Sequence, residues 1–402
     1  MTTRSHRAAV AALLTCALAV PLLGAAPASA SQQAQAHAQT RYSVPETRST
    51  GAPELPRPAG PHPVGRRTLH LVDRHRTDPW VPTARGREVL VSVSYPARRA
   101  GAGSPAAYVT TDEARLLLKA RDLTGVVPPE TLAGTRTHAR VGAAPARGRF
   151  PLVLLSPGFG MPRTTLTSLA DDLASRGYVV AAVDHAYESL ATEFPGGRVM
   201  PCVACEEVDA RVEFAGVVRG RAADLSFVID ELTDRRRAGA LARVIDPRRI
   251  GAAGHSIGGA TAAAAMAADR RVRAGVDLDG DFFVDDAGAG LGRRPFMMVG
   301  AEDTYSPGSD GTDWAGAWDR LHGWKRWLTV EGAGHFSFTD FPWLGDRLGL
   351  PTDPEVPLSG ERSWHITRDY VAAFFELHLR GVPQPLLQGP TDLRPEVDFH
   401  RP

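Results

Sequence analysis

Gly254-His255-Ser256-Ile257-Gly258 stands between a short apolar run that begins at Arg249 and an alanine-rich stretch from Ala260 to Ala268. The apolar run predicts a buried strand, and the alanines predict the helix that follows it. The glycines on both sides of Ser256 have no Cβ atom, so the chain can make a tight turn between strand and helix. A serine on such a turn stands clear of its neighbours, where a base can take its proton. The pentapeptide therefore predicts Ser256 as a nucleophile at a strand-to-helix elbow.

Short continuous apolar runs alternate with helical patterns along most of the chain. The runs are Phe150 to Leu155, Tyr178 to Val183, Arg249 to Ala253, Val272 to Leu278, Pro295 to Val299 and Arg326 to Val330. Such runs are typical of strands that are buried on both faces. Apolar residues spaced three and four apart from Val208 to Leu232 predict a long amphipathic helix, and Arg67 to Val72 with Glu88 to Tyr95 predicts an antiparallel edge pair. The alternation predicts an α/β fold with a doubly wound, mostly parallel sheet and flanking helices.

The ends of the chain differ in composition from its middle. Residues 1–30 combine two arginines, an apolar run from Ala8 to Leu23 and the small-residue site Ala28-Ser29-Ala30, which predicts a Sec-type signal peptide cleaved near Ala30 and hence a secreted protein. Residues 31–65 are rich in Gln, Ala and Pro and predict a flexible leader. Residues 66–389 then suit one large catalytic domain, and residues 390–402 form a tail.

Residues 97–149 interrupt the alternation between the second and third predicted strands. Thr111 to Arg121 predicts a short helix, and the rest of this insertion is rich in Gly, Pro and Arg. An insertion of this size lies on the surface, and it either caps the active site or makes a passive excursion.

The charged residues nearly balance, with 46 Lys and Arg against 45 Asp and Glu. This balance favours neither nucleic acid nor an anionic membrane surface as a partner. After the predicted signal peptide, no segment approaches the roughly twenty apolar residues that span a bilayer. A small-molecule or lipid ester remains as the expected partner, with at most a transient contact to a lipid interface.

Two cysteines remain after the predicted cleavage, Cys202 and Cys205, in the loop-like stretch from Met200 to Glu206. Outside the cytoplasm such a pair favours a small structural disulfide, with free thiols as the alternative. A redox C-x-x-C or half of a zinc site lacks support, because no thioredoxin-like context surrounds the pair and no second ligand pair exists. The sequence therefore predicts no metal site.

Two main-chain N–H groups are candidates for an oxyanion hole. The N–H of Ile257 stands at the start of the helix after Ser256, where the helix dipole favours negative charge. Ser156-Pro157-Gly158-Phe159-Gly160 follows the strand from Phe150 to Leu155 directly, and the N–H of Phe159 is the natural second donor. The alternative for this loop is a glycine turn that only changes the direction of the chain.

The candidate base and acid follow later strands. His335 lies in the glycine-flexed loop from Glu331 to Phe336, and the alternative is a histidine that caps the next helix. Asp279 ends the strand after the nucleophile helix, and Asp303 ends the next strand. The residues alone leave both acids open, and either one gives the chain order Ser, Asp, His of α/β-hydrolases.

Three further residues are candidates for the substrate pocket. Phe282 and Phe336 follow Asp279 and His335 closely, so they either line an acyl pocket or pack in the core. His185 follows a predicted strand, where it either lines the pocket or holds a loop.

Several stretches resemble the platelet-activating-factor acetylhydrolase family of secreted lipases and esterases. They are Asp73 to Trp80, Ser94 to Ala97, Ser156 to Gly160, Val183 to His185, Gly254 to Thr261 and Leu278 to Gly280, and the resemblance covers most of Arg66 to Arg380. It implies an α/β-hydrolase fold and calcium-independent hydrolysis of short acyl esters, without a metal or cofactor. It also favours Asp279 over Asp303 as the acid. An acid at Asp303 resembles the placement in secreted bacterial triacylglycerol lipases and polyester hydrolases, so the assignment stays open.

The sequence thus leads to one main hypothesis, a secreted serine ester hydrolase in which His335, oriented by Asp279, deprotonates Ser256. Phe159 and Ile257 would hold the oxyanion, and water would release the acid. The alternatives within enzymology are a triacylglycerol lipase or polyester hydrolase that acts on longer or polymeric esters, and an acyltransferase. From another class comes a catalytically inert binding protein with a hydrolase fold.

Overall fold

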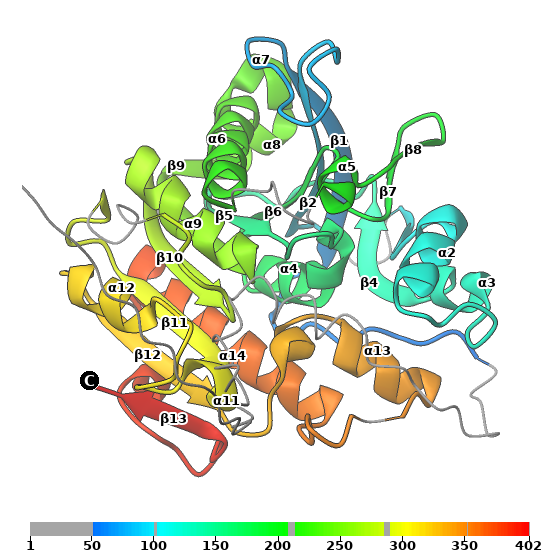
Figure 1. The fold of residues 1–402 in the computed structure, drawn as a ribbon. Helices are drawn as coiled ribbons and strands as arrows, with labels where there is room; N and C mark the ends of the chain where they lie inside the picture. Colours follow the sequence, from blue (N-terminus) through cyan, green and yellow to red (C-terminus); the bar gives the residue numbers. More distant parts are fainter. Residues whose placement is uncertain (1–50, 100–102, 208–213, 285–289, 352, 402) are drawn as a thin grey trace, which may run out of the picture.

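The predicted buried strands lie side by side in the centre of one eleven-stranded sheet (Figure 1). The computed structural model describes residues 51–99, 103–207, 214–284, 290–351 and 353–401. The parallel part of the sheet comprises β6 (Val179–His185), β5 (Phe150–Ser156), β9 (Ile245–His255), β10 (Val272–Leu278), β11 (Phe296–Ala301) and β12 (Lys325–Val330). Neighbouring residues of β5 point into opposite cores, since Leu152 and Leu154 join one hydrophobic cluster and Val153 and Leu155 join the other. The prediction of a mostly parallel sheet is confirmed.

Antiparallel strands complete the sheet at its two edges. On one side β2 (Arg87–Pro96) pairs antiparallel with β6 and with β1 (Val64–Asp73). Outward from β1, β4 (Arg136–Val141) pairs parallel with it, and β3 (Ser104–Ala107) pairs antiparallel with β4. On the other side β13 (Val397–His400) pairs antiparallel with β12, and the side chain of Val397 is buried there. Part of the predicted tail thus belongs to the sheet. A separate pair consists of β7 (Thr192–Phe194) and β8 (Arg198–Met200).

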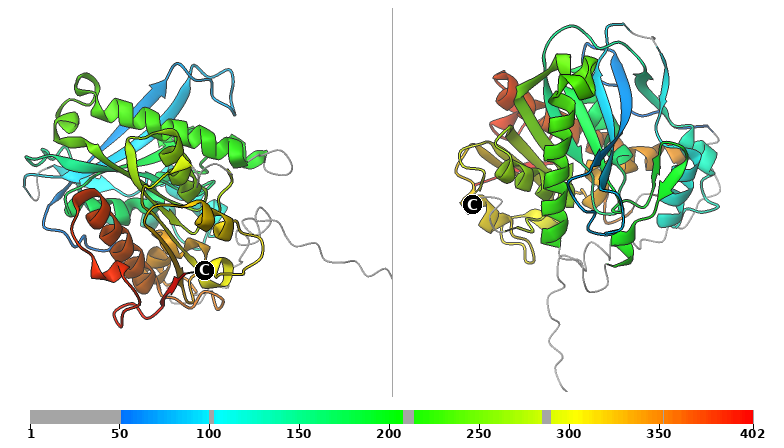
Figure 2. Two further views of the ribbon diagram at one scale, coloured as in Figure 1. Left: turned by 90° about the vertical axis from the view of Figure 1, so that its left-hand side faces the viewer. Right: turned by 90° about the horizontal axis from the view of Figure 1, so that it is seen from above.

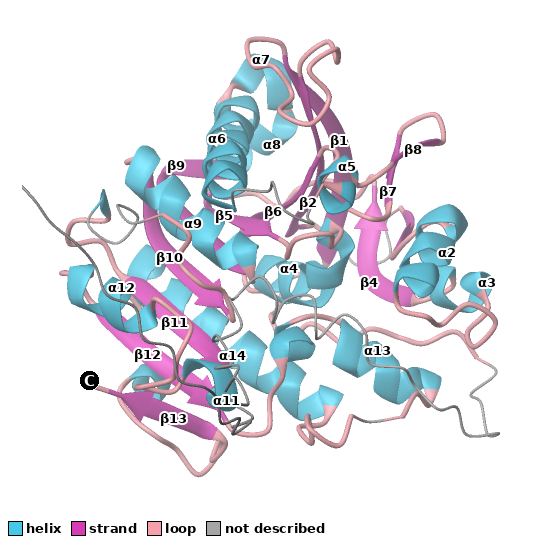
Figure 3. Cartoon of the chain, in the orientation of Figure 1, coloured by secondary structure: helices cyan, strands magenta, loops and turns pink. Residues whose placement is uncertain are grey.

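Helices cover both faces of the sheet, as the doubly wound prediction requires (Figures 2 and 3). On one face lie α6 (Phe214–Thr233) and α9 (Ile257–Ala268), and on the other lie α4 (Thr167–Ser175) and α14 (Gly360–Arg380). The predicted long helix from Val208 is observed from Phe214 onward, and its first residues Val208 and Val212 lie outside the described residues. The other helices are α2 (Thr111–Ala120), α3 (Pro129–Ala133), α5 (Val203–Glu206), α7 (Arg235–Ala238), α8 (Ala240–Val244), α11 (Glu302–Tyr305), α12 (Trp314–Arg320) and α13 (Phe341–Leu348), with 3-10 turns η2 (Arg163–Leu166), η3 (His335–Phe338) and η4 (Pro385–Leu387).

The insertion from 97 to 149 has a small core of its own. Helix α2 begins with a capping box, in which the Thr110 side chain accepts from the Glu113 N–H and the Glu113 carboxylate accepts from the Thr110 N–H. Leu117 and Leu118 of α2 pack in one cluster with Leu344 of α13. The insertion is therefore joined to α13, which begins six residues after His335, the candidate base.

Glu54 and Leu55, which composition assigns to a flexible leader, contact α13 and this insertion. The N–H of Leu55 donates to the carbonyl of Arg136 at 3.0 Å, and the indole N–H of Trp343 donates to the carbonyl of Glu54 at 2.9 Å. Leu55 is buried, which explains why a stretch with few large apolar residues is held in place.

Within the described residues, no helix has both the length and the apolar character needed to cross a bilayer.

Candidate active site

Ser256 lies between β9 and α9 in a backbone conformation that is rare for a residue with a side chain. Its φ is 57° and its ψ is −130°. Among the described non-glycine residues only Asp122, Tyr187, Ser256 and Asp279 have a positive φ. Strained backbone of this kind clusters at functional sites, because the surrounding structure must hold it in place. Here the Ser256 N–H donates to the carbonyl of Leu278 at 2.8 Å, which fixes the elbow against the end of β10.

The glycines beside Ser256 allow neighbouring backbone to approach the elbow. A Cβ atom on Gly258 would lie 2.0 Å from the carbonyl oxygen of Ser156, and one on Gly254 would lie 2.2 Å from the carbonyl carbon of Gly258. Real Cβ atoms do not occupy such positions, so only glycine fits at both places. The elbow is therefore packed directly against the end of β5, from which the candidate oxyanion loop starts.

His335 and Asp279 form a hydrogen-bonded pair at the same edge of the sheet. Nδ1 of His335 lies 2.6 Å from Oδ2 of Asp279, and the other oxygen of Asp279 accepts from the Ala301 N–H at 2.6 Å. Asp279 is buried, with 2% of its surface exposed. Because an ionised carboxylate only accepts hydrogen bonds, Nδ1 carries the hydrogen and Nε2 has a free lone pair. The pair therefore gives His335 the tautomer that a general base needs.

Within the described residues, neither the Ser256 hydroxyl nor Nε2 of His335 has a hydrogen-bond partner. Catalytic hydrogen bonds are often long in unliganded enzymes and shorten only in the substrate complex.

Two other aspartates near the site do not contact His335. Asp303 lies exposed on α11, in the wall of the same cavity as His335. Asp277 is completely buried under the elbow, without a hydrogen-bond partner among the described residues. Burial raises the pKa of Asp277 well above its usual value, and the nearby Asp279 adds to this rise. Of these three aspartates, Asp279 alone bonds to His335, the candidate base.

His255, the neighbour of the nucleophile, has a role that the sequence did not indicate. Its Nε2 donates to the main-chain carbonyl of His335 at 2.7 Å, and the two rings lie 4.7 Å apart between centroids. Burial lowers the pKa of His255 well below its usual value, so its ring is neutral. The only sequence signal for this role is its position next to Ser256.

The two proposed oxyanion donors are both available. Neither the N–H of Phe159 nor that of Ile257 donates to another group in the described part of the chain. Ile257 is the first residue of α9, and the Phe159 ring packs edge-on against Phe214 at 5.6 Å. Two unpaired N–H groups beside a nucleophile can stabilise the negative charge of a tetrahedral intermediate.

The three candidate pocket residues have different surroundings. Phe336 lines a cavity of about 300 Å³ beside His335. Phe282 is buried and packs against Phe296 at 5.9 Å between centroids, which is ordinary core packing. His185 is also buried, lines none of the three cavities described here, and bonds to Ser156 and Asp224 instead.

The cavity beside His335 is enclosed partly by the insertion. Leu117 and Leu118 of α2 face it together with Phe341 of α13, and the Arg121 guanidinium lies over the rings of Phe336 and Phe341, 3.9 and 4.5 Å from their centroids. The insertion therefore supplies one wall of the space next to the candidate base.

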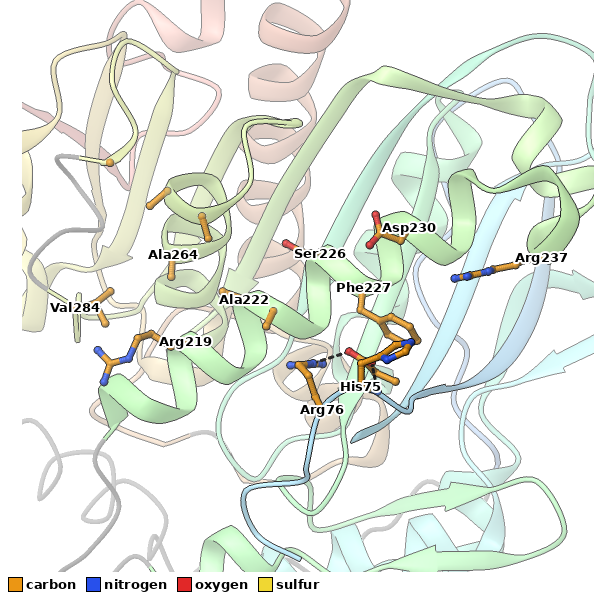
Figure 4. A pocket seen from close by; sticks show the side chains of 15 residues that line it. His75, Arg76, Arg219, Ala222, Ser226, Phe227, Asp230, Arg237, Ala264 and Val284 are labelled. Carbon is orange, nitrogen blue, oxygen red and sulfur yellow. Dashed lines mark hydrogen bonds and ion pairs between the residues drawn. The ribbon is translucent and has the colours of Figure 1, made fainter. Parts of the chain in front are cut away.

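The largest of the three cavities described, about 960 Å³, lies elsewhere (Figure 4). Its wall contains Ala222, Ser226 and Phe227 of α6, and His75 and Arg76 from the loop after β1. The three triad candidates do not line it, so cavity size does not locate the site here.

Cys202 and Cys205 form a disulfide across α5, which confirms the predicted pairing. A Cβ atom on Gly160 would lie 3.5 Å from Sγ of Cys205, so the disulfide turn lies against the end of the candidate oxyanion loop.

Known proteins resemble this chain over most of its length. A probable 1-alkyl-2-acetylglycerophosphocholine esterase from Arthroderma benhamiae is 28% identical over 383 residues, which cover 86% of this chain and 93% of the relative. A platelet-activating factor acetylhydrolase from Canis lupus familiaris is 25% identical over 247 residues, about half of each chain. The solved structure of a ferulic acid esterase from Streptomyces cinnamoneus shares 46% sequence identity with a TM-score of 0.77, and the match covers 87% of this chain and all of that one.

The family model agrees with these similarities. Residues 49–195 and 224–350 match the model of platelet-activating factor acetylhydrolase, isoform II, and together they make up well over half of the chain. The chain therefore belongs to the platelet-activating factor acetylhydrolase isoform II family, and it is a carboxylic ester hydrolase with an α/β-hydrolase fold.

Proposed function

We propose that the chain hydrolyses small-molecule carboxylic esters with Ser256 as nucleophile, His335 as general base and Asp279 as the acid that orients it. The observation that carries this proposal is the 2.6 Å hydrogen bond from His335 to the buried Asp279, at the sheet edge where Ser256 stands on its strained elbow. Asp303 remains exposed and without such a contact, which supports Asp279 as the acid.

The reaction has two halves. In the first, Nε2 of His335 takes the hydroxyl proton while Oγ of Ser256 attacks the ester carbonyl carbon, and the N–H groups of Phe159 and Ile257 bind the resulting oxyanion. His335 then gives the proton to the leaving alcohol, and an acyl-enzyme remains. In the second half, His335 takes a proton from water while the water oxygen attacks the acyl carbon. His335 then returns that proton to Oγ of Ser256 as the bond between Oγ and the acyl carbon breaks, which releases the carboxylic acid and restores the serine.

The first candidate substrate class is an ester with a short acyl group. The fungal relative is named for removing the acetyl group of a glycerophosphocholine, and its match covers nearly all of both chains. A cavity of about 300 Å³ beside His335 accommodates a small ester group.

A second candidate class is an ester of an aromatic acid. It is favoured by the 46% identity with the ferulic acid esterase, the highest identity among the relatives named above, and by the rings of Phe336 and Phe341 in the cavity wall. Aromatic walls bind a planar ring by stacked or edge-on contacts.

The test of the mechanism uses a serine-directed fluorophosphonate. Wild-type protein should be labelled at Ser256 and lose its ester hydrolysis, and Ser256→Ala should be neither labelled nor active. Undiminished hydrolysis by Ser256→Ala would overturn the proposal.

The test of the substrate uses a panel of esters. Nitrophenyl acetate, butyrate and decanoate, methyl ferulate and a 1-alkyl-2-acetyl phospholipid should be compared by kcat/KM. A maximum at acetate with cleavage of the phospholipid selects the first class, and a maximum at ferulate selects the second. Rates that rise steadily with chain length would instead indicate a lipase or polyester hydrolase.

We also propose that the protein is secreted. The pattern of residues 1–30 supports export, and the Cys202–Cys205 disulfide suits an oxidising compartment. Sequencing of the exported protein should find Ser31 at its amino terminus.

A further inference from the structure

A second set of Ser, His and Asp lies beneath the proposed oxyanion loop, with the hydrogen-bond order of a catalytic triad. Oγ of Ser156 lies 3.0 Å from Nε2 of His185, and Nδ1 of His185 lies 2.7 Å from Oδ2 of Asp224. Burial lowers the pKa of His185, and the nearby Arg221 adds to this effect. The ring is therefore neutral, donates through Nδ1 to Asp224 and accepts the hydroxyl proton of Ser156 on Nε2.

This set is too deeply buried to be a second active site. Ser156 and Asp224 have no exposed surface, and His185 is 2% exposed. None of the three lines any of the cavities described above. A nucleophile must be reached by its substrate, so these side chains serve the structure around them.

What the set holds is the start of the oxyanion loop. Ser156 is the last residue of β5, and Phe159 follows it by three residues. His185 ends β6, and Asp224 lies on α6. The hydrogen bonds thus tie the first residue of the loop to the neighbouring strand and to the helix that covers it (Figure 1).

Arg221 fixes the next residue of the loop. It lies three residues before Asp224 on α6, and its Nη1 donates to the carbonyl of Pro157 at 2.7 Å. Its Nε donates to Oε2 of Glu188 at 2.6 Å. The main-chain carbonyl of Glu188 in turn accepts from the Gly160 N–H at 3.1 Å. The loop is therefore anchored on both sides of Phe159.

The anchors belong to one network of ion pairs that is buried except at Arg76, whose side chain is partly exposed. Three guanidinium groups face four carboxylates in it: Arg76, Arg87 and Arg221 with Asp73, Asp78, Glu188 and Asp224. Arg87 bridges the acids, since it donates to Glu188 at 2.6 Å and to Asp224 at 2.9 Å. A fully paired network of this kind is rigid, because every displaced group would lose a partner where water cannot replace it.

We propose that Arg221 and the set Ser156, His185 and Asp224 are positioning residues that hold the Phe159 N–H where the oxyanion forms. The proposal rests on the proposed function, because the oxyanion exists only if Ser256 attacks an ester. A misplaced donor weakens binding of the transition state and leaves ground-state binding nearly intact. Loosening the loop therefore lowers kcat and kcat/KM together.

The decisive variant is Arg221→Lys, because lysine keeps the charge opposite Glu188 but cannot hold Glu188 and the Pro157 carbonyl in one planar fork. The matched control is Arg66→Lys. Arg66 is also buried, and its guanidinium also joins a carboxylate, Asp171 at 2.7 Å, to a main-chain carbonyl, that of Ala107 at 3.3 Å. Arg66 has no contact with the oxyanion loop among the contacts described here.

With nitrophenyl acetate, kcat and kcat/KM of Arg221→Lys should fall about tenfold, less than the 10²- to 10³-fold cost of removing an oxyanion donor outright. Affinity for a trifluoromethyl ketone, which forms a tetrahedral adduct with the serine, should fall by a similar factor. Arg66→Lys should keep the wild-type kcat, even if its melting temperature falls as far as that of Arg221→Lys.

Ser156→Ala is the second variant, and it tests the same proposal if Arg221→Lys does not fold. It removes only the hydroxyl that donates to Nε2 of His185. The unpaired Nε2 should lower the melting temperature, and kcat of the folded variant should again fall. Wild-type kcat in the folded variants, or an equal loss in Arg66→Lys, would overturn the proposal. Failure of the proposed function would be seen separately, as hydrolysis that survives Ser256→Ala.

Discussion

Nε2 of His255 donates a 2.7 Å hydrogen bond to the main-chain carbonyl of His335, so the residue before Ser256 holds the backbone of the proposed base. His255 ends β9, and His335 begins η3. The bond therefore joins the elbow at Ser256 to the loop that carries His335, across 80 residues of sequence. Since the His255 ring is completely buried and neutral, the contact does not depend on its protonation near pH 7.

Replacing His255 with phenylalanine should weaken catalysis more than it weakens the fold. An aromatic ring is kept, although phenyl is larger than imidazole, and the carbonyl of His335 loses its partner, at a cost of about 1–3 kcal/mol for a buried group left unpaired. A base displaced by a fraction of an ångström should lower kcat about tenfold. Steady-state kinetics on folded protein, with a thermal melt alongside, measures both effects. Unchanged kcat would show that His335 is held by Asp279 alone.

Asp279→Asn should reduce turnover by about three to four orders of magnitude, because the amide no longer selects the tautomer of His335 with hydrogen on Nδ1. Asp303→Asn is the matched control, since it makes the same chemical change at an aspartate that lines the cavity beside His335 but does not bond to His335. It should stay within about twofold of wild type, as is usual for an exposed side chain without a partner. The reverse result in a nitrophenyl ester assay would assign the acid to Asp303.

Gly258→Ala should disrupt the site, because the new Cβ would lie 2.0 Å from the Ser156 carbonyl oxygen. The end of β5 and the oxyanion loop must then shift, which should cost about 1–3 kcal/mol of stability or more and most of the activity. Gly220→Ala is the control. Its Cβ meets nothing within 4 Å on α6, so it should stabilise the protein by about 0.5–1 kcal/mol. A thermal melt of both variants checks this, and an equally stable Gly258→Ala would contradict the packing argument.

The sequence predicted the centre of the sheet well, because local pattern and tertiary structure agree there. A run such as Phe150 to Leu155 is apolar at every position, and the structure buries alternate residues on the two faces of the sheet. The elbow was also predictable, since its glycines and its strand-to-helix setting are local features. His335 and Asp279 were predicted from their places after strands, and the parallel sheet brings those strand ends to one edge.

The sequence was less informative where a contact depends on distant residues. The strand β13 forms by pairing with the edge strand β12, about 70 residues earlier in the chain. The local pattern of Val397 to His400 does not predict that pairing. His185 was a candidate for the pocket by its place after a strand. Its buried partner Asp224 lies 39 residues away on a helix, so no local pattern could show the pair.

Asp340→Asn should change how stability depends on pH. The Asp340 carboxyl is buried at the start of α13, where it accepts from the Ser168 N–H at 3.2 and 3.3 Å. Burial raises its pKa to about 8, and the nearby Asp171 adds to this rise. The unfolded chain has the ordinary value near 4, so between pH 4 and 8 the folded state binds more protons than the unfolded state.

The stability that Asp340 contributes is therefore full below about pH 4 and is lost as the pH rises through about 8, with a slope of up to about 1.4 kcal/mol per pH unit. Asparagine stays neutral and can still accept from Ser168, so the melting temperature of Asp340→Asn relative to wild type should rise from pH 5 to about pH 8 and level off above it. The exposed Asp303→Asn should show a constant difference from wild type over this range. A constant difference for Asp340→Asn as well would mean that Asp340 is already ionised in the folded protein at pH 5, and that burial does not hold its proton.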